Sequence, residues 1–338
     1  MHLNASNPPV AFAEVWRGEF LECVHFGHAV VCDAAGDVVH AWGDPDLVFL
    51  PRSSSKMIQA LPLVTSGAAD RFGLSDRHLA LACASHAGAA IHTDLASDWL
   101  STLSLDDTAL RCGSQSPRPE DVRDALILAG QQPCQVHNNC SGKHTGFLTV
   151  GAHLGAGPEY IQPDHPVQLA VRDAFEDATG MTAPGYAIDG CSAPNFATTL
   201  TGAARAMAKF ATAHHRTDTS SQAASRLAAA MMRFPELVSG EGQGCTEIMR
   251  AAEGRAAVKT GAEGVYFAIL PDLELGIALK IVDGAGRGAE CAIAALLVRF
   301  GVLDRNDPRV KSFLEAPILN LRDLVTGHVL PSAELVSG

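Results

Sequence analysis

A serine and a lysine three residues apart could act together at the beginning of a predicted helix. Ser53 and Lys56 belong to the run Arg-Ser-Ser-Ser-Lys, and residues three apart share one face of a helix, about 5–6 Å apart at Cβ. A serine hydroxyl becomes a strong nucleophile when a base removes its proton. A lysine amine can be that base once burial lowers its pKa from about 10.4 towards 7, which takes about 4.6 kcal/mol. Alternatively, Ser53 caps the helix and Lys56 lies on its surface.

A second serine and a second lysine of this kind occur further along the chain. Lys259 begins a Lys-Thr-Gly sequence on a predicted strand, and Ser85 lies in a Cys-Ala-Ser-His sequence. A serine at a helix start facing a Lys-Thr-Gly strand is the arrangement of penicillin-binding proteins and class A β-lactamases, although their Ser-Asp-Asn element is absent here. Ser85 could supply the missing serine. Alternatively, it is an ordinary serine at the end of a helix.

Two polar segments contain thiols that could bind a metal. Cys140 and Lys143 occupy one segment, and Asp189 and Cys191 lie two residues apart in the other. Two thiolates and a neutral amine can bind zinc and leave a fourth position open, provided that the lysine loses its proton. Alternatively, the two cysteines are small buried residues or form a disulfide, which a reducing compartment disfavours.

Alternating segments at both ends of the chain predict strands, and periodic segments between them predict helices. The order predicts one α/β sheet domain, residues 1–74 and 240–338, that carries an inserted mainly helical domain, residues 75–239, with the active site between them. Pro62 predicts a kink or an early end in the helix expected over 53–64. The predicted strands are 15–24, 28–33, 37–42, 255–259, 264–270 and 275–282, and the other predicted helices are 75–84, 93–103, 118–129, 166–179, 195–214, 221–234 and 288–300.

The composition excludes several classes of protein. The chain has 338 residues, 47% of them hydrophobic, and a formal net charge of -12. It can therefore bury a large core, which excludes disorder, and it offers no basic stripe for nucleic acid or an anionic membrane. It shows neither a signal-peptide pattern nor an apolar run of about 20 residues. The nine cysteines then indicate reduced thiols, and we expect a cytoplasmic protein.

Taken together, these residues resemble the rhizobial-type L-asparaginases, or asparaginase II family, from about residue 13 to residue 300. Five separate motifs occur in the family's order. The resemblance implies an α/β fold in which helices flank an antiparallel sheet and a mainly helical domain is inserted, as in serine β-lactamases and glutaminases. The five motifs are Phe49–Lys56, Cys83–His86, Cys140–His144, Asp189–Cys191 and Lys259–Gly264.

The resemblance implies hydrolysis of the side-chain amide of L-asparagine to L-aspartate and ammonia. It implies a serine acyl-enzyme and two Ser–Lys pairs, which here are Ser53 with Lys56 and Ser85 with Lys259. It further implies a homodimer.

The resemblance also implies a zinc site formed by Cys140, Lys143 and Cys191, with Asp189 close to the metal. The zinc is expected to position substrate rather than to activate water. Arg52 is a candidate for binding the substrate α-carboxylate because a guanidinium binds carboxylates in a bidentate way. Asp189 is a candidate for the α-ammonium, and His144 is the third candidate substrate-binding residue.

Three alternatives remain open. The first is a glutaminase, whose substrate differs by one methylene, which is worth only about 1–3 kcal/mol in a pocket. The second is a serine hydrolase of β-lactams or peptides, and the third is a catalytically inactive, zinc-dependent binding protein. The chain also departs from the family at Cys245, where an acidic residue is expected, and this affects the edge of the predicted site.

Overall fold

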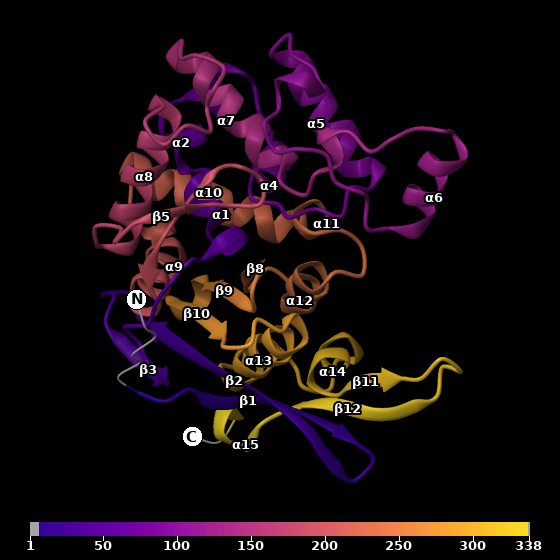
Figure 1. Ribbon diagram of the computed structural model, residues 1–338. Coiled ribbons are helices and arrows are strands. Elements are labelled where there is room, and N and C mark those ends of the chain that lie inside the picture. The colour runs from indigo at the N-terminus through magenta and orange to yellow at the C-terminus, as the bar shows by residue number, and fades with distance from the viewer. Residues whose placement is uncertain (1–6, 337–338) are drawn as a thin grey trace. The chain divides into compact units, whose positions relative to one another are not determined.

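The computed structural model describes residues 7–336, and the chain divides into two compact units (Figure 1). Within the described residues, the first unit comprises 7–54, 198–212 and 247–336, and the second comprises 55–197 and 213–246. The prediction assigned residues 55–74 and 240–246 to the sheet domain, whereas the structure groups them with the helical unit. Conversely, residues 198–212 lie in the helical domain of the prediction but in the first unit of the structure.

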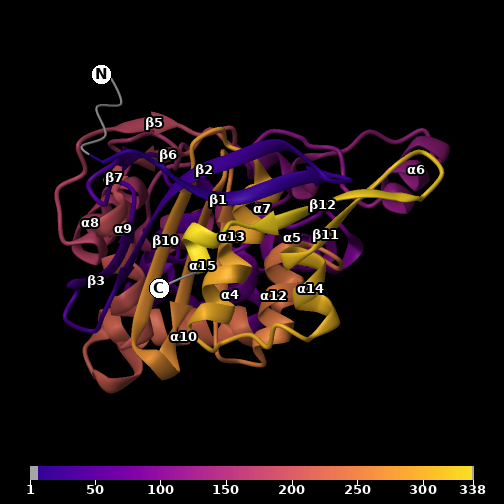
Figure 2. The ribbon, with the colours of Figure 1, turned by 90° about the horizontal axis from the view of Figure 1, so that it is seen from below.

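The first unit is built on an eight-stranded sheet in which every neighbouring pair of strands is antiparallel, as predicted. The strand order is β11-β12-β1-β2-β10-β9-β8, and β3 also pairs with β2; Figure 2 shows β10, β2, β1 and β12 in that order. The strands are β1 (Val10–Arg17), β2 (Phe20–Cys32), β3 (Val38–Trp42), β8 (Ala257–Gly261), β9 (Val265–Leu270), β10 (Leu275–Ile281), β11 (Ala316–Leu319) and β12 (Val325–Pro331).

Two helices cover opposite faces of this sheet. Helix α9 (Leu200–Ala211) contacts β10 and β2, and Gly276 allows the close approach, since a Cβ there would lie 2.1 Å from the Ala208 nitrogen. Gly276 pairs with Cys32 on β2, so Cys32 faces the same side of the sheet as α9. Side chains alternate along a strand, and His25 is an odd number of positions from Cys32, so His25 faces the other side. That side is covered by α13 (Gly286–Arg299), where a Cβ on Gly288 would lie 2.9 Å from His25. The unit also contains α14 (Pro308–Leu314), α15 (Ala333–Val336) and the short pair β4 (Val48–Phe49) and β7 (Thr198–Thr199).

The second unit is mainly helical, as predicted for the insertion. It also contains the two-stranded pair β5 (Tyr186–Ile188) and β6 (Pro194–Phe196). Helix α12 (Gly244–Ala252) contributes residues to both units. The helices of the second unit are α1 (Lys56–Gln59), α2 (Leu61–Thr65), α3 (Ala68–Arg71), α4 (Asp76–Ala82), α5 (Ala90–Thr102), α6 (Glu120–Leu128), α7 (Ser141–Leu154), α8 (Pro166–Thr179), α10 (Thr219–Arg233) and α11 (Pro235–Val238).

Helix α7 lies at the centre of this unit and is buried continuously from Ser141 to Gly151. It contacts α2, α3, α4, α5 and α8. A Cβ on Gly142 would lie 2.3 Å from the carbonyl oxygen of Leu81 in α4. Glycine at this position therefore lets the first turn of α7 approach the end of α4 directly, which brings two of the sequence motifs together.

Some predicted elements differ from the observed ones for local reasons. The strand predicted over 15–24 is wrong, because β1 ends at Arg17 and Gly18 turns the chain with φ +57° before β2 begins. The helix predicted to begin at Thr93 begins at Ala90 instead. The helix predicted over 53–64 breaks at Ala60, and Pro62 lies in the first turn of the next helix. Backbone N–H groups in a first turn make no hydrogen bond within the helix, so a proline is tolerated there.

Candidate active site

Lys56 is fully buried at the beginning of α1, and its amine contacts the Cys83–His86 segment. The Nζ atom donates to the carbonyl oxygen of Ala84, lies 3.0 Å from Ser85 Oγ, and lies 3.5 Å from the carbonyl oxygen of Asn139. All of these residues belong to the second unit. The burial excludes the alternative in which Lys56 is a surface residue.

The partners of Lys56 restrict where its protons can go. Two of the three are carbonyl oxygens, which only accept hydrogen bonds, so they take two of the amine's N–H groups. The third, Ser85 Oγ, can accept a hydrogen bond from an ammonium or donate its own proton to a neutral amine. Among these contacts, proton exchange with Lys56 is therefore possible only at Ser85. The prediction paired Lys56 with Ser53 instead, and that pairing stays a prediction.

The first unit positions the other predicted catalytic residues. Lys259 is fully buried on β8, and its Nζ donates to the carbonyl oxygen of Thr260 at 2.7 Å. At the end of this strand, a Cβ on Gly261 would lie 2.6 Å from the carbonyl oxygen of Pro51. The turn that carries Ser53 therefore packs directly on the Lys-Thr-Gly strand. The pairing of Lys259 with Ser85 stays a prediction.

Arg52, the predicted carboxylate-binding residue, has a left-handed backbone with φ +54°. A non-glycine residue in this region is under local strain, and such residues concentrate at functional sites. Arg52 directly precedes Ser53, so this unusual backbone conformation helps to set the position of the predicted nucleophile.

Cys140, Lys143 and Cys191 form a second cluster, which is buried in the second unit. Lys143 Nζ donates to Cys191 Sγ at 3.1 Å, the two cysteine side chains are hydrogen-bonded to each other, and Cys140 Sγ lies 2.9 Å from Asn139 Oδ1. Both cysteines are free thiols, so the disulfide alternative does not describe this structure. Cys191 therefore contacts both of the other residues predicted as zinc ligands.

The charges in this cluster are shared unequally. The hydrogen bond from Cys140, together with Lys143, holds the pKa of Cys191 well below its ordinary value. The same hydrogen bond and burial raise the pKa of Cys140 to about 12. Burial alone would lower the pKa of Lys143, but the facing Cys191, Cys140 and Asp189 outweigh it and raise that pKa. These directions favour a thiolate at Cys191, a thiol at Cys140 and an ammonium at Lys143.

The donor set fits the predicted zinc, because two sulfurs and an amine converge in a buried place. Residues 7–336 contain no group of three or more His, Cys, Asp and Glu side chains that could hold a metal ion. A zinc site here would thus depend on the lysine amine as its third protein ligand.

The two other predicted substrate-binding residues lie in the same unit. Asp189 is half-buried and interacts electrostatically with Lys143, and its backbone N–H donates to the Ala193 carbonyl oxygen at 2.9 Å. His144 is fully buried, and its Nδ1 lies 2.8 Å from the Tyr160 hydroxyl. His144 Nε2 is buried without a hydrogen-bond partner among the described residues. Contact of either residue with substrate stays a prediction.

The sequence interpretation gave no role to His86 and Ser141, although both lie inside the quoted motifs. His86 Nδ1 accepts a hydrogen bond from the Gly88 N–H at 3.1 Å, so the ring proton lies on Nε2 and faces Ser141 Oγ at 2.8 Å. Burial, together with His92 and Lys56, holds the pKa of His86 well below its ordinary value. This neutral histidine ties the Cys83–His86 segment to the beginning of α7.

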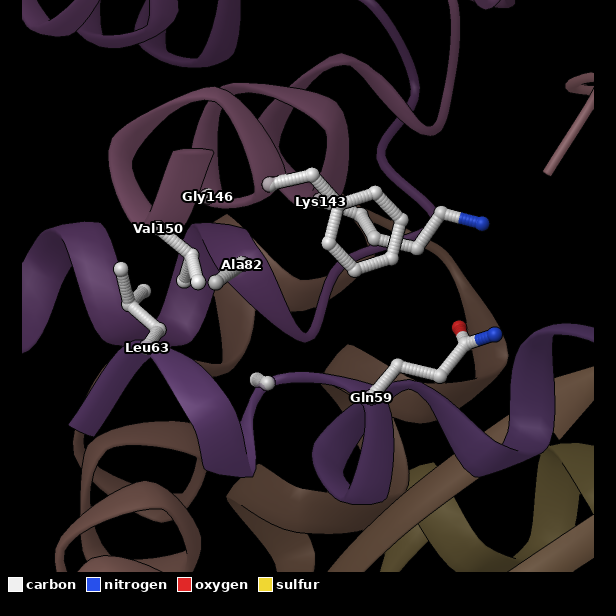
Figure 3. Close-up of a pocket in the computed structure, with 8 residues that line it drawn as sticks. Gln59, Leu63, Ala82, Lys143, Gly146 and Val150 are labelled. Atoms are coloured by element: carbon white, nitrogen blue, oxygen red, sulfur yellow. The ribbon is translucent and has the colours of Figure 1, made fainter. Parts of the chain in front are cut away.

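A small cavity of about 10 Å³ adjoins the stem of Lys143 (Figure 3). Its lining includes Leu63, Phe147 and Val150, and the polar ends of Gln59 and Lys143 extend away from Leu63 and Val150. A cavity of this size holds at most one water molecule. It belongs to the packing around Lys143 and is too small for an amino-acid substrate.

Comparison with known proteins decides the family. A model of the family described as L-asparaginase II matches residues 13–331. The chain belongs to the L-asparaginase II family. It is thus an amidohydrolase, as predicted.

Further comparisons found weaker likenesses. A crystal structure of a protein called Mglu covers 87% of this asparaginase II chain and 72% of its own, at 14% identity and a TM-score of 0.47. A β-lactamase from Mycobacterium bovis covers 81% and 94%, at 16% identity and a TM-score of 0.46. No curated protein matches the chain. Over residues 7–336, no helix has the length and apolar character needed to cross a bilayer.

Proposed function

We propose that the protein is an L-asparaginase that cleaves the side-chain amide of L-asparagine through a serine acyl-enzyme. The observation that carries the mechanism is the contact of the buried Lys56 amine with Ser85 Oγ. A lysine amine in contact with a serine hydroxyl can accept the proton that a serine nucleophile must lose. Family membership supports the amide as the bond that is cleaved.

In the proposed first step, Ser53 Oγ attacks the carboxamide carbon, and its proton passes to Lys56 by way of Ser85, the hydroxyl that contacts the Lys56 amine. The carbon–nitrogen bond then breaks, and the nitrogen leaves as ammonia after taking up a proton. Water hydrolyses the ester to L-aspartate and restores the serine. Ser85, which contacts Lys56, and Lys259, which lies on β8, relay protons or hold charge during these steps.

We propose that Arg52 binds the substrate α-carboxylate and that Asp189 binds the α-ammonium, with His144 as a further contact. Zinc would be held by Cys140, Lys143 and Cys191, and when bound it would help to hold the substrate in place. What supports this is the contact of Cys191 with both Lys143 and Cys140 and the electrostatic interaction of Asp189 with Lys143. Without zinc, the same cluster is an ion pair between Lys143 and the Cys191 thiolate.

We also propose a cytoplasmic homodimer. Nine free cysteines support a reducing compartment. Exposed apolar side chains support self-association. The β1–β2 and β11–β12 hairpins, joined by the hydrogen bond from Gly18 N–H to the Thr326 carbonyl oxygen, expose Phe20 and Leu321 at 80% and 106%. Light scattering should find a dimer for the wild type and a monomer for Phe20→Asp with Leu321→Asp. A wild-type monomer would contradict the proposal.

The deciding experiment is ammonia release from L-asparagine and L-glutamine, measured for the wild type, Ser53→Ala, Ser85→Ala and Ser54→Ala. We expect strong release from asparagine and a loss of at least about 10³-fold in Ser53→Ala, as for removal of other catalytic nucleophiles. Ser54→Ala is the matched control, because its hydroxyl is already bonded to the Pro51 carbonyl oxygen.

The other outcomes separate the alternatives. Release from both amides would make the protein an asparaginase–glutaminase with the same mechanism. Activity that survives in Ser53→Ala but not in Ser85→Ala would move the nucleophile to Ser85. If neither amide is cleaved by zinc-loaded, folded protein, the asparaginase proposal is wrong, and turnover of nitrocefin would then support the β-lactam alternative.

A further inference from the structure

Four reactive or charged side chains meet at the beginning of α13 in the first unit. His25 Nδ1 lies 2.6 Å from Asp283 Oδ2, and Arg287 Nε donates to His25 Nε2 at 2.9 Å. The sulfur of Cys23 lies 3.8 Å from Arg287 Nη2 and 4.0 Å from His25 Nε2. None of these residues belongs to the proposed amide-hydrolysing site.

The fold holds this cluster in place. Cys23 and His25 are alternate residues of β2 and therefore lie on the same face of the sheet. Gly288 lets α13 approach this face, since a Cβ there would lie 2.9 Å from His25. Asp283 is fixed by its Oδ1, which accepts a hydrogen bond from the Ala285 N–H at 2.9 Å. Asp283, which precedes the helix, and Arg287, in its first turn, thus contact the two ring nitrogens of His25.

The hydrogen bonds define the state of the histidine. Asp283 is an acceptor, so the proton on Nδ1 points to it and the unshared pair is on Nε2. That pair accepts the Arg287 Nε–H, so the carboxylate and the imidazole together hold the guanidinium in place. The guanidinium lies next to the sulfur of Cys23, and a cation beside a sulfur is the setting of a reactive cysteine.

Cys23 is also one of the accessible cysteines. Seven of the nine cysteines are buried, whereas Cys23 and Cys134 are half-buried. Cys134 lies 3.3 Å from His137 Nδ1, but that nitrogen already accepts the Cys134 N–H, and burial raises the pKa of the Cys134 thiol. Cys134 therefore provides an internal control of similar exposure that lacks an arginine beside the sulfur.

We propose that Cys23 is a modification site that exchanges with small, negatively charged disulfides. The sulfur attacks one sulfur of the disulfide, a new sulfur–sulfur bond forms, and the old one breaks. The proton of Cys23 is released to solvent before the attack, and the departing thiolate takes up a proton from solvent. Cys23 is oxidised to a mixed disulfide, and the other half of the reagent is reduced to a thiol.

Arg287 gives the site its preference for anions. The guanidinium is exposed and lies beside the attacking sulfur, so it can bind a carboxylate of the incoming disulfide. The protein as a whole carries a net charge of -12, which repels anionic reagents in general. A preference for an anionic disulfide at Cys23 would thus be a local property of this cluster.

The test measures the rate of mixed-disulfide formation at each cysteine of the full chain by peptide mass mapping, with glutathione disulfide as the anionic reagent and cystamine as the cationic one. We expect glutathione disulfide to modify Cys23 at least about tenfold faster than Cys134. Arg287→Gln should remove most of this advantage at Cys23 and leave Cys134 unchanged. Arg17→Gln, which removes an exposed arginine of the same hairpin that pairs with Glu22, is the matched control and should leave both rates unchanged.

Comparing the anionic with the cationic reagent separates activation of Cys23 by Arg287 from the mere solvent exposure of its thiol. In the wild type, the ratio of the glutathione disulfide rate to the cystamine rate should be higher at Cys23 than at Cys134, and Arg287→Gln should bring the two ratios together. His25→Asn should slow both reagents at Cys23. Equal rates at Cys23 and Cys134, or an Arg287→Gln variant with an unchanged Cys23 rate and ratio, would overturn the proposal.

Discussion

Two lysines of the second unit, Lys56 and Lys143, are both buried and both hydrogen-bonded, yet their surroundings differ in charge. Lys56 contacts two carbonyl oxygens and a serine hydroxyl, all of them neutral. Lys143 contacts the Cys191 sulfur, with Cys140 and Asp189 close by. Neutral partners let an amine exchange a proton, whereas anionic partners hold the ammonium until a metal replaces the proton. This difference is why we propose proton transfer for Lys56 and metal binding for Lys143.

The largest expected effect concerns Lys56. Lys56→Met should lower kcat for L-asparagine by about 10²–10⁴-fold, because the group that exchanges a proton with serine is lost. Lys56→Arg should be as inactive, since a guanidinium does not deprotonate. Lys311→Met, which removes an exposed lysine, is the control for activity, and circular dichroism checks folding. An active Lys56→Arg would show that Lys56 supplies charge rather than a base.

A smaller effect is expected for the thiol cluster. Cys191→Ser should lose bound zinc, measured by elemental analysis, and should raise KM more than it lowers kcat, by about 10–100-fold, because the site positions substrate. Cys291→Ser changes another buried thiol and should keep the zinc. A Cys191→Ser protein with undiminished zinc would remove Cys191 from the ligand set.

The smallest expected effect is a loss of folding stability in acid. It tests whether His86, whose pKa Lys56 helps to lower, is neutral in the folded protein. The pKa of His86 is lowered in the folded protein, so the unfolded chain binds a proton first as the pH falls below about 6.5. The stability that His86 contributes is then complete above that pH and is lost below it, by up to about 1.4 kcal/mol per pH unit.

Urea unfolding at pH 7.5, 6.5 and 5.5 measures this dependence. His86→Gln should flatten the loss of stability between pH 6.5 and 5.5, whereas His215→Gln, at an exposed histidine, should not. Identical profiles for the wild type and His86→Gln would contradict the assignment of a neutral, buried His86.

Local sequence signals predicted much of the second unit. Helix α8 has the predicted bounds, because Pro166 suits the first turn and Gly180 ends the helix with φ +69°. Ser75 precedes α4 as a cap residue, also as predicted. The strand predicted over 15–24 failed because alternation alone does not reveal a turn at Gly18.

Contacts between distant segments were harder to predict. The spacing rule finds partners three or four residues apart, so it pairs Lys56 with Ser53 and cannot find Ser85, which lies 29 residues away. Cys23 and His25 likewise meet Arg287 only because β2 packs against α13. The residue types and the family resemblance together predicted Cys140, Lys143 and Cys191 as zinc ligands. The structure shows that Cys191 contacts the other two, and zinc binding stays a prediction.

The central claim is that a serine carries the substrate acyl group. The most direct measurement is to mix the protein with L-asparagine, quench it in acid within milliseconds, and map the peptides by mass spectrometry. We predict an aspartyl ester on the peptide that contains Ser53, formed in the wild type and absent from Ser53→Ala. Steady turnover of asparagine with no ester on any serine, even at the earliest quench times, would contradict the acyl-enzyme mechanism.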